Sequence, residues 1–241
     1  MYKMLNLMTL NLWCYFDWEN RKDTIISVVN KLSPDIIAFQ EAQTNHSFSP
    51  WPQSDFIADN CEYKYQVFAP TYKRDGQIDK AGGMTQETSY GLALISKYPI
   101  MSAETYFLRR HPDYTEETSV LFCKIDVGGT IVDVCNVHFG NSELWSDLHL
   151  NELMDLCEER NIQPIILGDF NHFHLDVYKE NRLKDYSLST DIAEYESMPK
   201  NSGTLDYIVV PTKKYIIKSL VCPPEYVSDH RALFASIENN N

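Results

Sequence analysis

The sequence predicts an α/β (α+β) protein in which two packed β-sheets are covered by helices. Three observations support this prediction: many short apolar segments of strand length, few segments with helical periodicity, and polar residues where the apolar segments end. The hydrophobic fraction of 44% and the charged fraction of 23% are ordinary for a globular protein. We expect residues 1–241 to form a single domain.

The N-terminal segment predicts a β-α-β unit. A strand over residues 3–12 precedes a helix that Asp17 or Asn20 would cap and that stops at Ser33-Pro34. A short buried strand over residues 35–41 follows, and it ends in a carboxylate.

The middle of the chain predicts antiparallel strands. Residues 44–86 contain prolines, aromatic residues and glycines without a clear period, so we expect an irregular connection that either is functional or contains small elements of its own. The pair Gly128-Gly129 predicts a hairpin turn. The strands expected around this turn cover residues 91–99, 104–109, 118–127 and 131–139.

The C-terminal part predicts one helix and four strands. The helix covers residues 147–160, with Asn161 as its C-terminal cap. A loop with a short helix is expected over residues 172–203. The expected strands cover residues 164–168, 204–210, 215–220 and 232–237.

The segment Pro164-Ile-Ile-Leu-Gly-Asp-Phe-Asn171 suggests a site rather than core. Gly168 permits backbone angles that other residues resist, so it ends the strand. Asp169 and Asn171 lie two residues apart, which in extended geometry places both side chains on one side. A carboxylate and an amide directed together from a buried strand fit a catalytic site.

The charge of the chain limits its partners. The formal net charge is −13, which disfavours a non-specific grip on duplex DNA because such a grip needs a basic face. An acidic protein can still bind a phosphate ester through a divalent cation.

The cysteines and the apolar segments bear on the compartment. None of the six cysteines has the spacing of a zinc or redox motif, so we expect reduced thiols, although Cys123 and Cys135 could face each other on neighbouring strands. No segment has the length of a membrane helix, and the N-terminus is a poor signal peptide. We therefore expect a cytoplasmic protein.

Polar residues recur at the ends of the predicted strands. Glu41 and Asp229 offer the hard oxygen ligands that Mg²⁺ prefers. A histidine can donate to a charged oxygen or exchange a proton near neutral pH, and an aspartate can orient it or position a water molecule. The residues concerned are Asn11, Glu41, His138, Asp169, Asn171, Asp206, Asp229 and His230. Together they predict a metal-assisted hydrolase of a phosphate ester.

Several of these residues have a structural alternative. Asn11 could bond only the backbone of a turn, His138 could be a satisfied core histidine, and Asp206 could pair with Lys213 or Lys214. The aromatic residues just after Asn11 either line a substrate cleft and stack on a ring or pack in the core. These aromatic residues are Trp13, Tyr15, Phe16 and Trp18.

Two further groups suggest sites less strongly. His172 and His174 with Asp176 suggest zinc, but no third ligand has suitable spacing, so we expect a solvent-exposed loop. Arg109-Arg110 could bind a second phosphate, although a solvated turn is favoured.

The ordered motifs resemble the endonuclease/exonuclease/phosphatase (DNase I-like) superfamily. That group includes nucleases, bacterial sphingomyelinases, inositol polyphosphate 5-phosphatases and deadenylases. The resemblance covers about residues 4–237, and its strength lies in the order of the motifs rather than in any one of them. The motifs are Asn11, Gln40-Glu41, Gly91-Leu-Ala-Leu-Ile-Ser-Lys-Tyr-Pro-Ile100, Asn136-Val-His138, Gly168-Asp-Phe-Asn171, Asp206-Tyr207 and Ser228-Asp-His230.

The resemblance implies a four-layer αββα sandwich and dependence on Mg²⁺ or Mn²⁺. It implies that Glu41 is the principal metal ligand, with Asn11 and Asp229 close to the metal. It also implies roles for the remaining residues: Asp169 for the attacking water, Asn171 for the scissile phosphate, His230 paired to Asp206 for charge on the phosphoryl oxygens, and His138 for a second phosphate contact.

The sequence departs from the family pattern in three respects. One is its acidic balance, which lacks the basic DNA-binding face of the apurinic endonucleases. The helix after His138 lacks the arginine and glutamine common in relatives, which affects local packing. No catalytic tyrosine of the apurinic-endonuclease type aligns, and Tyr106 and Tyr114 are only candidates.

The predicted function is a Mg²⁺-dependent phosphoesterase, a monomer that hydrolyses a phosphodiester in a nucleotide, a single-stranded nucleic acid or a phosphorylated small molecule. A sphingomyelinase-like enzyme and an inositol-phosphate-type phosphatase are alternatives within the family. A catalytically silent binding module on the same fold is the alternative from another class.

Overall fold

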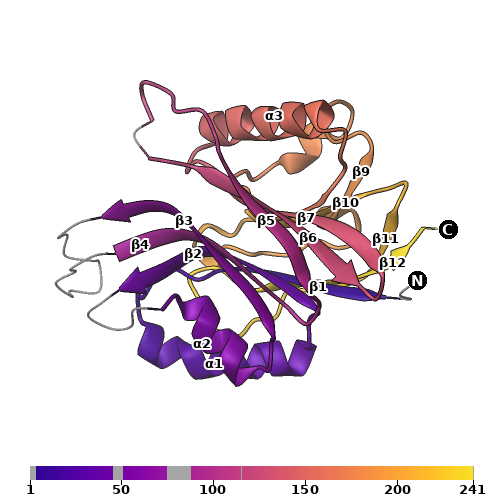
Figure 1. The fold of residues 1–241 in the computed structure, drawn as a ribbon. Coiled ribbons are helices and arrows are strands. Elements are labelled where there is room, and N and C mark those ends of the chain that lie inside the picture. Colours follow the sequence, from indigo (N-terminus) through magenta and orange to yellow (C-terminus); the bar gives the residue numbers. More distant parts are fainter. Residues whose placement is uncertain (1–3, 46–50, 75–87, 115, 241) are drawn as a thin grey trace.

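The computed structural model describes residues 4–45, 51–74, 88–114 and 116–240. Within these residues two six-stranded sheets pack face to face, and helices cover both outer faces (Figure 1). Helices α1 (Trp18–Leu32) and α2 (Gln53–Asn60) lie on the first sheet, and α3 (Glu143–Glu159) lies on the second. This arrangement confirms the predicted four-layer αββα sandwich.

The first sheet has the strand order β11-β12-β1-β2-β4-β3, and the second has the order β5-β6-β7-β8-β10-β9. The strands of the first sheet are β1 (Leu5–Asn11), β2 (Ile36–Asn45), β3 (Tyr65–Arg74), β4 (Thr88–Ser96), β11 (Tyr215–Val221) and β12 (Leu233–Asn239). Those of the second are β5 (Ile100–Phe107), β6 (Ser119–Val127), β7 (Thr130–His138), β8 (Ile165–Asp169), β9 (Tyr186–Leu188) and β10 (Asp206–Pro211). Short 3₁₀ turns cover Leu175–Tyr178, Ser189–Asp191 and Pro199–Asn201.

The apolar residues form three packed layers. One lies between the sheets and takes residues such as Leu7, Leu167 and Ile208 from both of them. A second joins α1 and α2 to the first sheet, and a third joins α3 to the second. The central strands are therefore buried on both faces, which explains why β1 and β8 are almost continuous apolar segments.

Strand pairing brings the polar strand ends to one edge. β1 and β2 run parallel, and Asn11 lies opposite Gln40. β7 and β8 also run parallel, and His138 lies opposite Asp169. β10 runs antiparallel to β8, so Asp206 at its start also lies opposite Asp169.

The helix boundaries agree with the sequence pattern except at one start. Asp17 directly precedes α1, as one of the two expected caps, and Ser33 ends it. Asn161 has a φ of 50° directly after the last turn of α3, in the left-handed conformation of a C-terminal cap. However, α3 begins at Glu143 rather than at residue 147, after Ser142 in extended geometry.

Of the two alternatives for residues 44–86, small elements within the connection are confirmed, although the described portion is less irregular than expected. Its described portion contains α2 and β3, while residues 46–50 and 75–87 lie outside the described residues. β3 contains Pro70, is the edge strand of its sheet and has a register shift between Pro70 and Tyr72. An edge strand tolerates a proline because one side of its backbone needs no partner.

The cysteines agree with the expected reduced state, since all six are free. Cys123 lies opposite Val134 and Cys135 lies opposite Phe122, so the two thiols are offset by one residue in the pairing of β6 and β7. Successive residues of a strand point to opposite faces, so Cys123 enters the layer between the sheets and Cys135 the layer under α3. The possible contact between them does not form.

Candidate active site

Asp169 is the last residue of β8, and its position depends on the glycine before it. Gly168 has a φ of 149°, and a Cβ added there would lie 2.0 Å from the carbonyl oxygen of Val137 on β7. Only glycine allows β8 to lie this close to β7. The close approach places the carboxylate of Asp169 beside the end of β7.

The carboxylate of Asp169 contacts groups from both sheets. Its Oδ2 atom accepts a hydrogen bond from Asn11 Nδ2 at 3.1 Å. The same oxygen lies 3.7 Å from His138 Nε2 and 3.7 Å from His230 Nε2. Asp169 is only 1% exposed, so these contacts lie in a site shielded from water.

Asn171 does not continue the strand, and the expectation that it points with Asp169 from extended backbone is wrong. Its φ is 51°, which is the left-handed conformation that asparagine tolerates better than most residues. Its backbone N–H donates to Asp169 Oδ1 at 2.9 Å, and its side-chain amide donates to the carbonyl of Phe139 at 2.9 Å. The backbone of this turn therefore holds one oxygen of the Asp169 carboxylate in place.

His230 and Asp206 form a buried pair. His230 Nδ1 donates to Asp206 Oδ2 at 2.8 Å, and the backbone N–H of Asp206 donates to the hydroxyl of Ser197. Burial acts to lower the pKa of His230, but the carboxylates of Asp206 and Asp169 outweigh it and raise the pKa to about 10. Burial acts to raise the pKa of Asp206, and the charge of His230 opposes this. The pair is an imidazolium held by a carboxylate.

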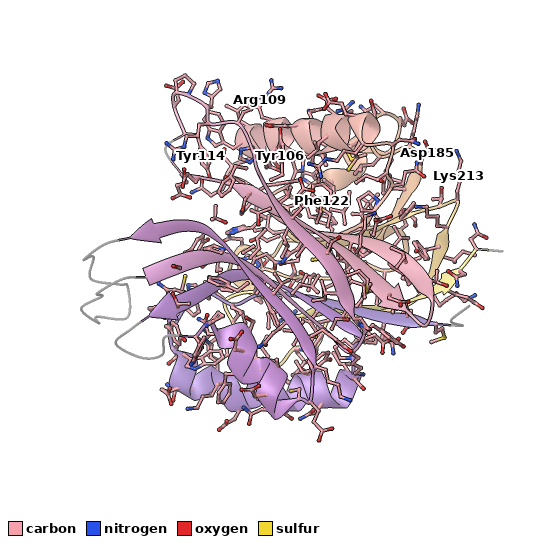
Figure 2. The ribbon with its side chains drawn as sticks, viewed as in Figure 1. Tyr106, Arg109, Tyr114, Phe122, Asp185 and Lys213 are labelled. Carbon is pink, nitrogen blue, oxygen red and sulfur yellow. The ribbon has the colours of Figure 1, made fainter. Side chains whose placement is uncertain are left out.

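The lysine alternative for Asp206 is wrong. Lys213 pairs with Asp185, and Figure 2 shows both at the edge of the second sheet. Lys214 donates to the carbonyl of Gln163.

His138 is half-buried and directed at the same carboxylate. Its Nδ1 lies 3.3 Å from the hydroxyl of Tyr90 on β4, and its Nε2 faces Asp169. The hydroxyl of Tyr90 fixes the ring orientation from the opposite sheet, and sequence reasoning did not identify Tyr90. His138 therefore belongs to the site and not to the core.

Glu41 lies at a break in the β2 ladder. Phe39 pairs with Ala93 and Ala42 with Gly91, so β2 has one residue more than β4 at this point. Such a β-bulge redirects a side chain, and Glu41 takes a φ of 52° within it. Its carboxylate accepts from Asn11 Nδ2 at 3.3 Å and lies 3.4 Å from the thiol of Cys14.

Asn11 links Glu41 to Asp169. Its Nδ2 reaches both carboxylates, and its Oδ1 accepts the backbone N–H of Trp13 at 2.9 Å. The turn contact proposed as an alternative for Asn11 thus exists together with the site contacts. Cys14 was not identified from the sequence.

Asp229 is half-buried beside His230, and its Oδ1 accepts from the hydroxyl of Ser228 at 3.1 Å. No hydrogen bond or ion pair joins Asp229 to Glu41 among the described residues. In those residues, the group of acidic, histidine or cysteine ligand atoms within 4.8 Å of one another consists of Asp169, Asp206 and His230. His230 Nδ1 is bonded to Asp206 Oδ2 at 2.8 Å, so two members of this group are already joined by a hydrogen bond.

A buried arginine holds two loops of the site together. Arg21 on α1 is 0% exposed and donates to the carbonyls of Leu12, Cys14, Phe16 and Val227. Burial lowers the pKa of Arg21, and the nearby Tyr226, Asp229 and Asp17 oppose this. Val227 directly precedes the Ser228-Asp-His230 turn, so Arg21 ties this turn to the loop after Asn11. Its spacing from Ile25 and Val28 places it on the apolar side of α1, which is the signal that could have identified it.

The two weaker candidate sites, at His172 and His174 and at Arg109-Arg110, make contacts that stabilise the fold. His172 is buried, with Nε2 3.0 Å from Asp147 Oδ1, so the expectation of a solvent-exposed loop is wrong for His172 and right for His174. Arg109 pairs with Glu152 and Arg110 with Glu117, in the exposed connection near α3 (Figure 2). These pairings favour the solvated turn.

The two candidate tyrosines also bond elsewhere. Tyr106 donates to Glu152 and Tyr114 donates to Glu116. Neither hydrogen bond involves a residue of the predicted site.

The profile of the Endonuclease/Exonuclease/phosphatase family matches residues 8–230. The chain belongs to this family. The match spans the site from Asn11 to His230, and it confirms the expected enzyme class, hydrolysis of phosphate esters. A comparison with curated protein sequences gives no match.

Solved structures share the fold at low sequence identity. An endonuclease/exonuclease/phosphatase from Beutenbergia cavernae has a TM-score of 0.80 at 15% identity, over 99% of this chain and 72% of that one. The human Nocturnin catalytic domain has a TM-score of 0.73 at 18% identity, over 100% of this chain and 96% of that one. Sphingomyelinase C from Streptomyces griseocarneus has a TM-score of 0.65 at 17% identity, over 98% and 99% of the two chains.

Proposed function

We propose that the chain is a divalent-metal-dependent phosphodiesterase that uses Mg²⁺ or Mn²⁺. The carrying observation is the position of one atom, Asp169 Oδ2, which lies near Asn11 Nδ2, His138 Nε2 and His230 Nε2 at once. A carboxylate with three nitrogen neighbours, from β1, β7 and the turn before β12, can hold a water molecule and direct it toward a phosphate bound between the histidines. Asn11, His138 and His230 are far apart in the sequence, yet all three meet at this oxygen.

The residues around Glu41 fit a divalent cation. Neither Glu41 nor Asp229 pairs with a lysine or arginine in the described part of the chain, and the hydrogen-bond donors near them are an amide, a thiol and a hydroxyl. Half-exposed carboxylates are the ligand type that Mg²⁺ and Mn²⁺ accept. Glu41 would be the principal ligand, with Asn11 and Asp229 close to it. Bound there, the ion would neutralise charge on the phosphoryl oxygens.

The remaining residues have roles toward the phosphate. The imidazolium of His230, held by Asp206, donates a hydrogen bond to a phosphoryl oxygen and stabilises the negative charge that grows there. His138, oriented by the hydroxyl of Tyr90, would make a second contact to the phosphate. The side chain of Asn171 would hold the scissile phosphate after it leaves the carbonyl of Phe139. Asp169 positions the water and accepts its proton.

Related structures support a phosphate-binding site without naming the substrate. The Nocturnin domain was solved with a bound sulfate anion, and the Streptomyces protein is a sphingomyelinase C. The acidic charge of −13 favours nucleotides, single strands and small phosphate esters over duplex DNA for this chain.

The test is hydrolysis of bis-p-nitrophenyl phosphate by the purified chain with Mg²⁺, with Mn²⁺ and with a chelator. We expect activity that needs the metal and that falls at least about 100-fold in Asp169→Asn and in Glu41→Gln. Asp113→Asn is the matched control, because Asp113 is exposed and outside the site. Activity that survives either site change contradicts the role given to that residue. An inactive wild type on a broad panel of phosphate esters favours the silent binding module.

The proposal includes the assembly of the protein. We propose a single domain over residues 1–241, because the site draws residues from Asn11 to His230. We propose a monomer in the cytoplasm, which the six free cysteines support. No helix in the described ranges has the length and apolar character needed to cross a membrane.

A further inference from the structure

Trp13 lies beside Asn11, at the end of the candidate site where the metal is proposed to bind. Its backbone N–H donates to Asn11 Oδ1 at 2.9 Å, and the thiol of the next residue, Cys14, lies 3.4 Å from Glu41 Oε2. Trp13 and Cys14 both adopt left-handed backbone angles, with φ values of 52° and 47°. Two successive residues in this uncommon conformation turn the chain sharply, and strained turns of this kind concentrate at ligand sites.

The turn divides the aromatic residues that follow Asn11. Tyr15 and Trp18 are 6% and 7% exposed and belong to the core under α1. Trp13 is half-buried and Phe16 is 37% exposed, and their ring centroids lie 4.0 Å apart. The sequence alone allowed these four aromatic residues either to line a substrate cleft or to pack in the core. The structure assigns Tyr15 and Trp18 to the core. Trp13 stays partly exposed, with Arg21 Cζ 5.7 Å from its ring centroid.

A lysine from the connection between β9 and β10 lies over the indole of Trp13. Lys200 Nζ is 5.0 Å from the ring centroid, and Lys200 belongs to the 3₁₀ turn Pro199–Asn201. Ser197, just before this turn, binds the backbone N–H of Asp206 with its hydroxyl and that of Arg231 with its carbonyl. The turn that carries Lys200 is therefore anchored next to the His230–Asp206 pair.

Lys200 has no carboxylate partner among the residues that the structure describes. Other lysines of this acidic chain do pair, for example Lys124 with Asp133 and Lys97 with Asp35. A cation over an aromatic face is attracted by it, but less strongly than by a phosphate in a shielded site. An unpaired cation beside the site of a protein with a net charge of −13 is suited to an anionic ligand.

We propose that Trp13 and Lys200 form a nucleotide subsite, in which a base stacks on the indole and Lys200 pairs with a phosphate next to the scissile one. The proposal rests on the proposed function and narrows its substrate class to nucleotides and short single strands. A sugar phosphate or an alkyl phosphate has no aromatic face to stack. A quaternary ammonium head group would be repelled by Lys200.

Ligand binding tests the subsite independently of turnover. The probes are adenosine 5′-diphosphate and pyrophosphate, titrated calorimetrically in Mg²⁺ against Asp169→Asn protein, which suppresses hydrolysis. We expect the nucleotide to bind about 10-fold more tightly than pyrophosphate, and Trp13→Ala on this background to remove the difference. Trp13→Phe keeps most of it, and Lys200→Gln weakens both ligands. Trp145→Ala is the control, because its ring contacts are with His111 and Tyr114.

The subsite proposal is overturned if Trp13→Ala keeps the preference for the nucleotide, if neither probe binds, or if phosphocholine binds more tightly than the nucleotide. Circular dichroism on each variant separates loss of binding from loss of fold. Should Trp13→Ala be unfolded, the Trp13→Phe and Lys200→Gln comparisons decide the question.

Kinetics separate this proposal from the proposed function. Thymidine 5′-(p-nitrophenyl phosphate) and methyl p-nitrophenyl phosphate share a leaving group and differ in the ring. We expect Trp13→Ala to lower kcat/KM for the thymidine ester about 10-fold and to leave the methyl ester within about twofold. Equal loss on both esters, or none on either, overturns the subsite while metal-dependent hydrolysis stands. If the wild type cleaves neither ester yet nucleotide binding depends on Trp13, the subsite stands and the proposed function fails.

Discussion

Two carboxylates of the same site are placed in opposite surroundings. Asp206 is fully buried and bonded to the imidazolium of His230 at 2.8 Å. Glu41 is half-exposed, and its hydrogen-bond neighbours are the amide of Asn11 and the thiol of Cys14. Both follow from strand geometry: Asp206 begins a strand between two others, whereas Glu41 stands in a bulge.

The contrast indicates how the charges are neutralised. A buried carboxylate must receive its counter-charge from the protein, since its desolvation is otherwise too costly. A half-exposed carboxylate with neutral neighbours can receive the counter-charge from a bound cation. Aspartate and glutamate carry the same charged group. Burial and hydrogen bonding separate the histidine-holding role of Asp206 from the metal-holding role proposed for Glu41.

Metal titrations should separate Glu41 from Asp169 most clearly. Glu41→Gln removes charge from the proposed metal ligands, so we expect the half-saturating Mn²⁺ concentration to rise at least about 10-fold. Asp169→Asn removes the group that holds water, so we expect kcat to fall about 1,000-fold while the half-saturating concentration stays within about threefold. The measurement is initial rate against Mn²⁺ concentration. The same shift in metal requirement for both variants would contradict the division of roles.

Asp206→Asn should cost stability that Glu41→Gln does not. The change leaves His230 charged and buried without its partner, so we expect the free energy of unfolding to fall by about 3–5 kcal/mol. Glu41 is bonded only to neutral groups, and Glu41→Gln should change stability by less than about 1 kcal/mol. Urea denaturation measures both. The double variant Asp206→Asn, His230→Gln serves as the control, because it removes the stranded charge and should recover part of the loss.

Arg21 tests whether the two loops of the site must be held together. Arg21→Met leaves two buried carbonyls, of Leu12 and Val227, and two part-buried ones short of a donor, so we expect a loss of about 2–4 kcal/mol in the free energy of unfolding. Arg21→Lys keeps the charge and part of the bonding, and it should lose less. The rate at saturating metal should fall about 10-fold in Arg21→Lys at a temperature where it is folded. An unchanged rate in Arg21→Lys would show that catalysis does not depend on the hydrogen bonds by which Arg21 joins the two loops.

His149 should give the smallest effect, and one that depends on pH. Burial lowers the pKa of His149 from 6.5 to about 4, and His138 acts in the same direction. Between these values the unfolded chain binds the proton and the folded chain does not, so stability falls as the pH drops from 6.5 toward 4. We expect a loss of about 1–2 kcal/mol across this window.

The matched variant is His149→Asn, which keeps an acceptor for the backbone N–H of Gly140. It should unfold with a smaller dependence on pH in urea titrations at pH 4.5 and 6.5. A variant with the full dependence of the wild type would assign the loss to other groups.

The features that could be predicted from the sequence are those that a local pattern of residues determines. The first two strands, with their polar ends, placed Asn11 and Glu41 together because parallel neighbours end at the same edge. The motif order predicted the family and the layers. The helix α2 and the strand β3 were missed because a proline and many aromatic residues hide their periodicity, while pairing at the sheet edge overrides it.

Other features of the site could not be predicted, because they depend on contacts between residues that are distant in the sequence or that strand periodicity does not show. The left-handed turn at Asn171 is stabilised by the carboxylate of Asp169 and the carbonyl of Phe139, and strand periodicity does not show either bond. Tyr90 is an ordinary strand tyrosine until the second sheet brings His138 to its hydroxyl. Arg21 lies in a charged stretch of sequence, and only the packing of two loops around it makes its burial favourable.

The order of strands in the first sheet has a consequence for folding kinetics. β1 pairs with β2 on one side and with β12, the last strand of the chain, on the other. Asn11 and His230 therefore meet at Asp169 only after nearly the whole chain is available, and such distant pairings form slowly. During synthesis β1 cannot pair with β12 until β12 has been made, so one apolar edge of β1 stays exposed until then. Appearance of catalytic activity in a refolding experiment should mark the end of folding, later than the return of helical signal.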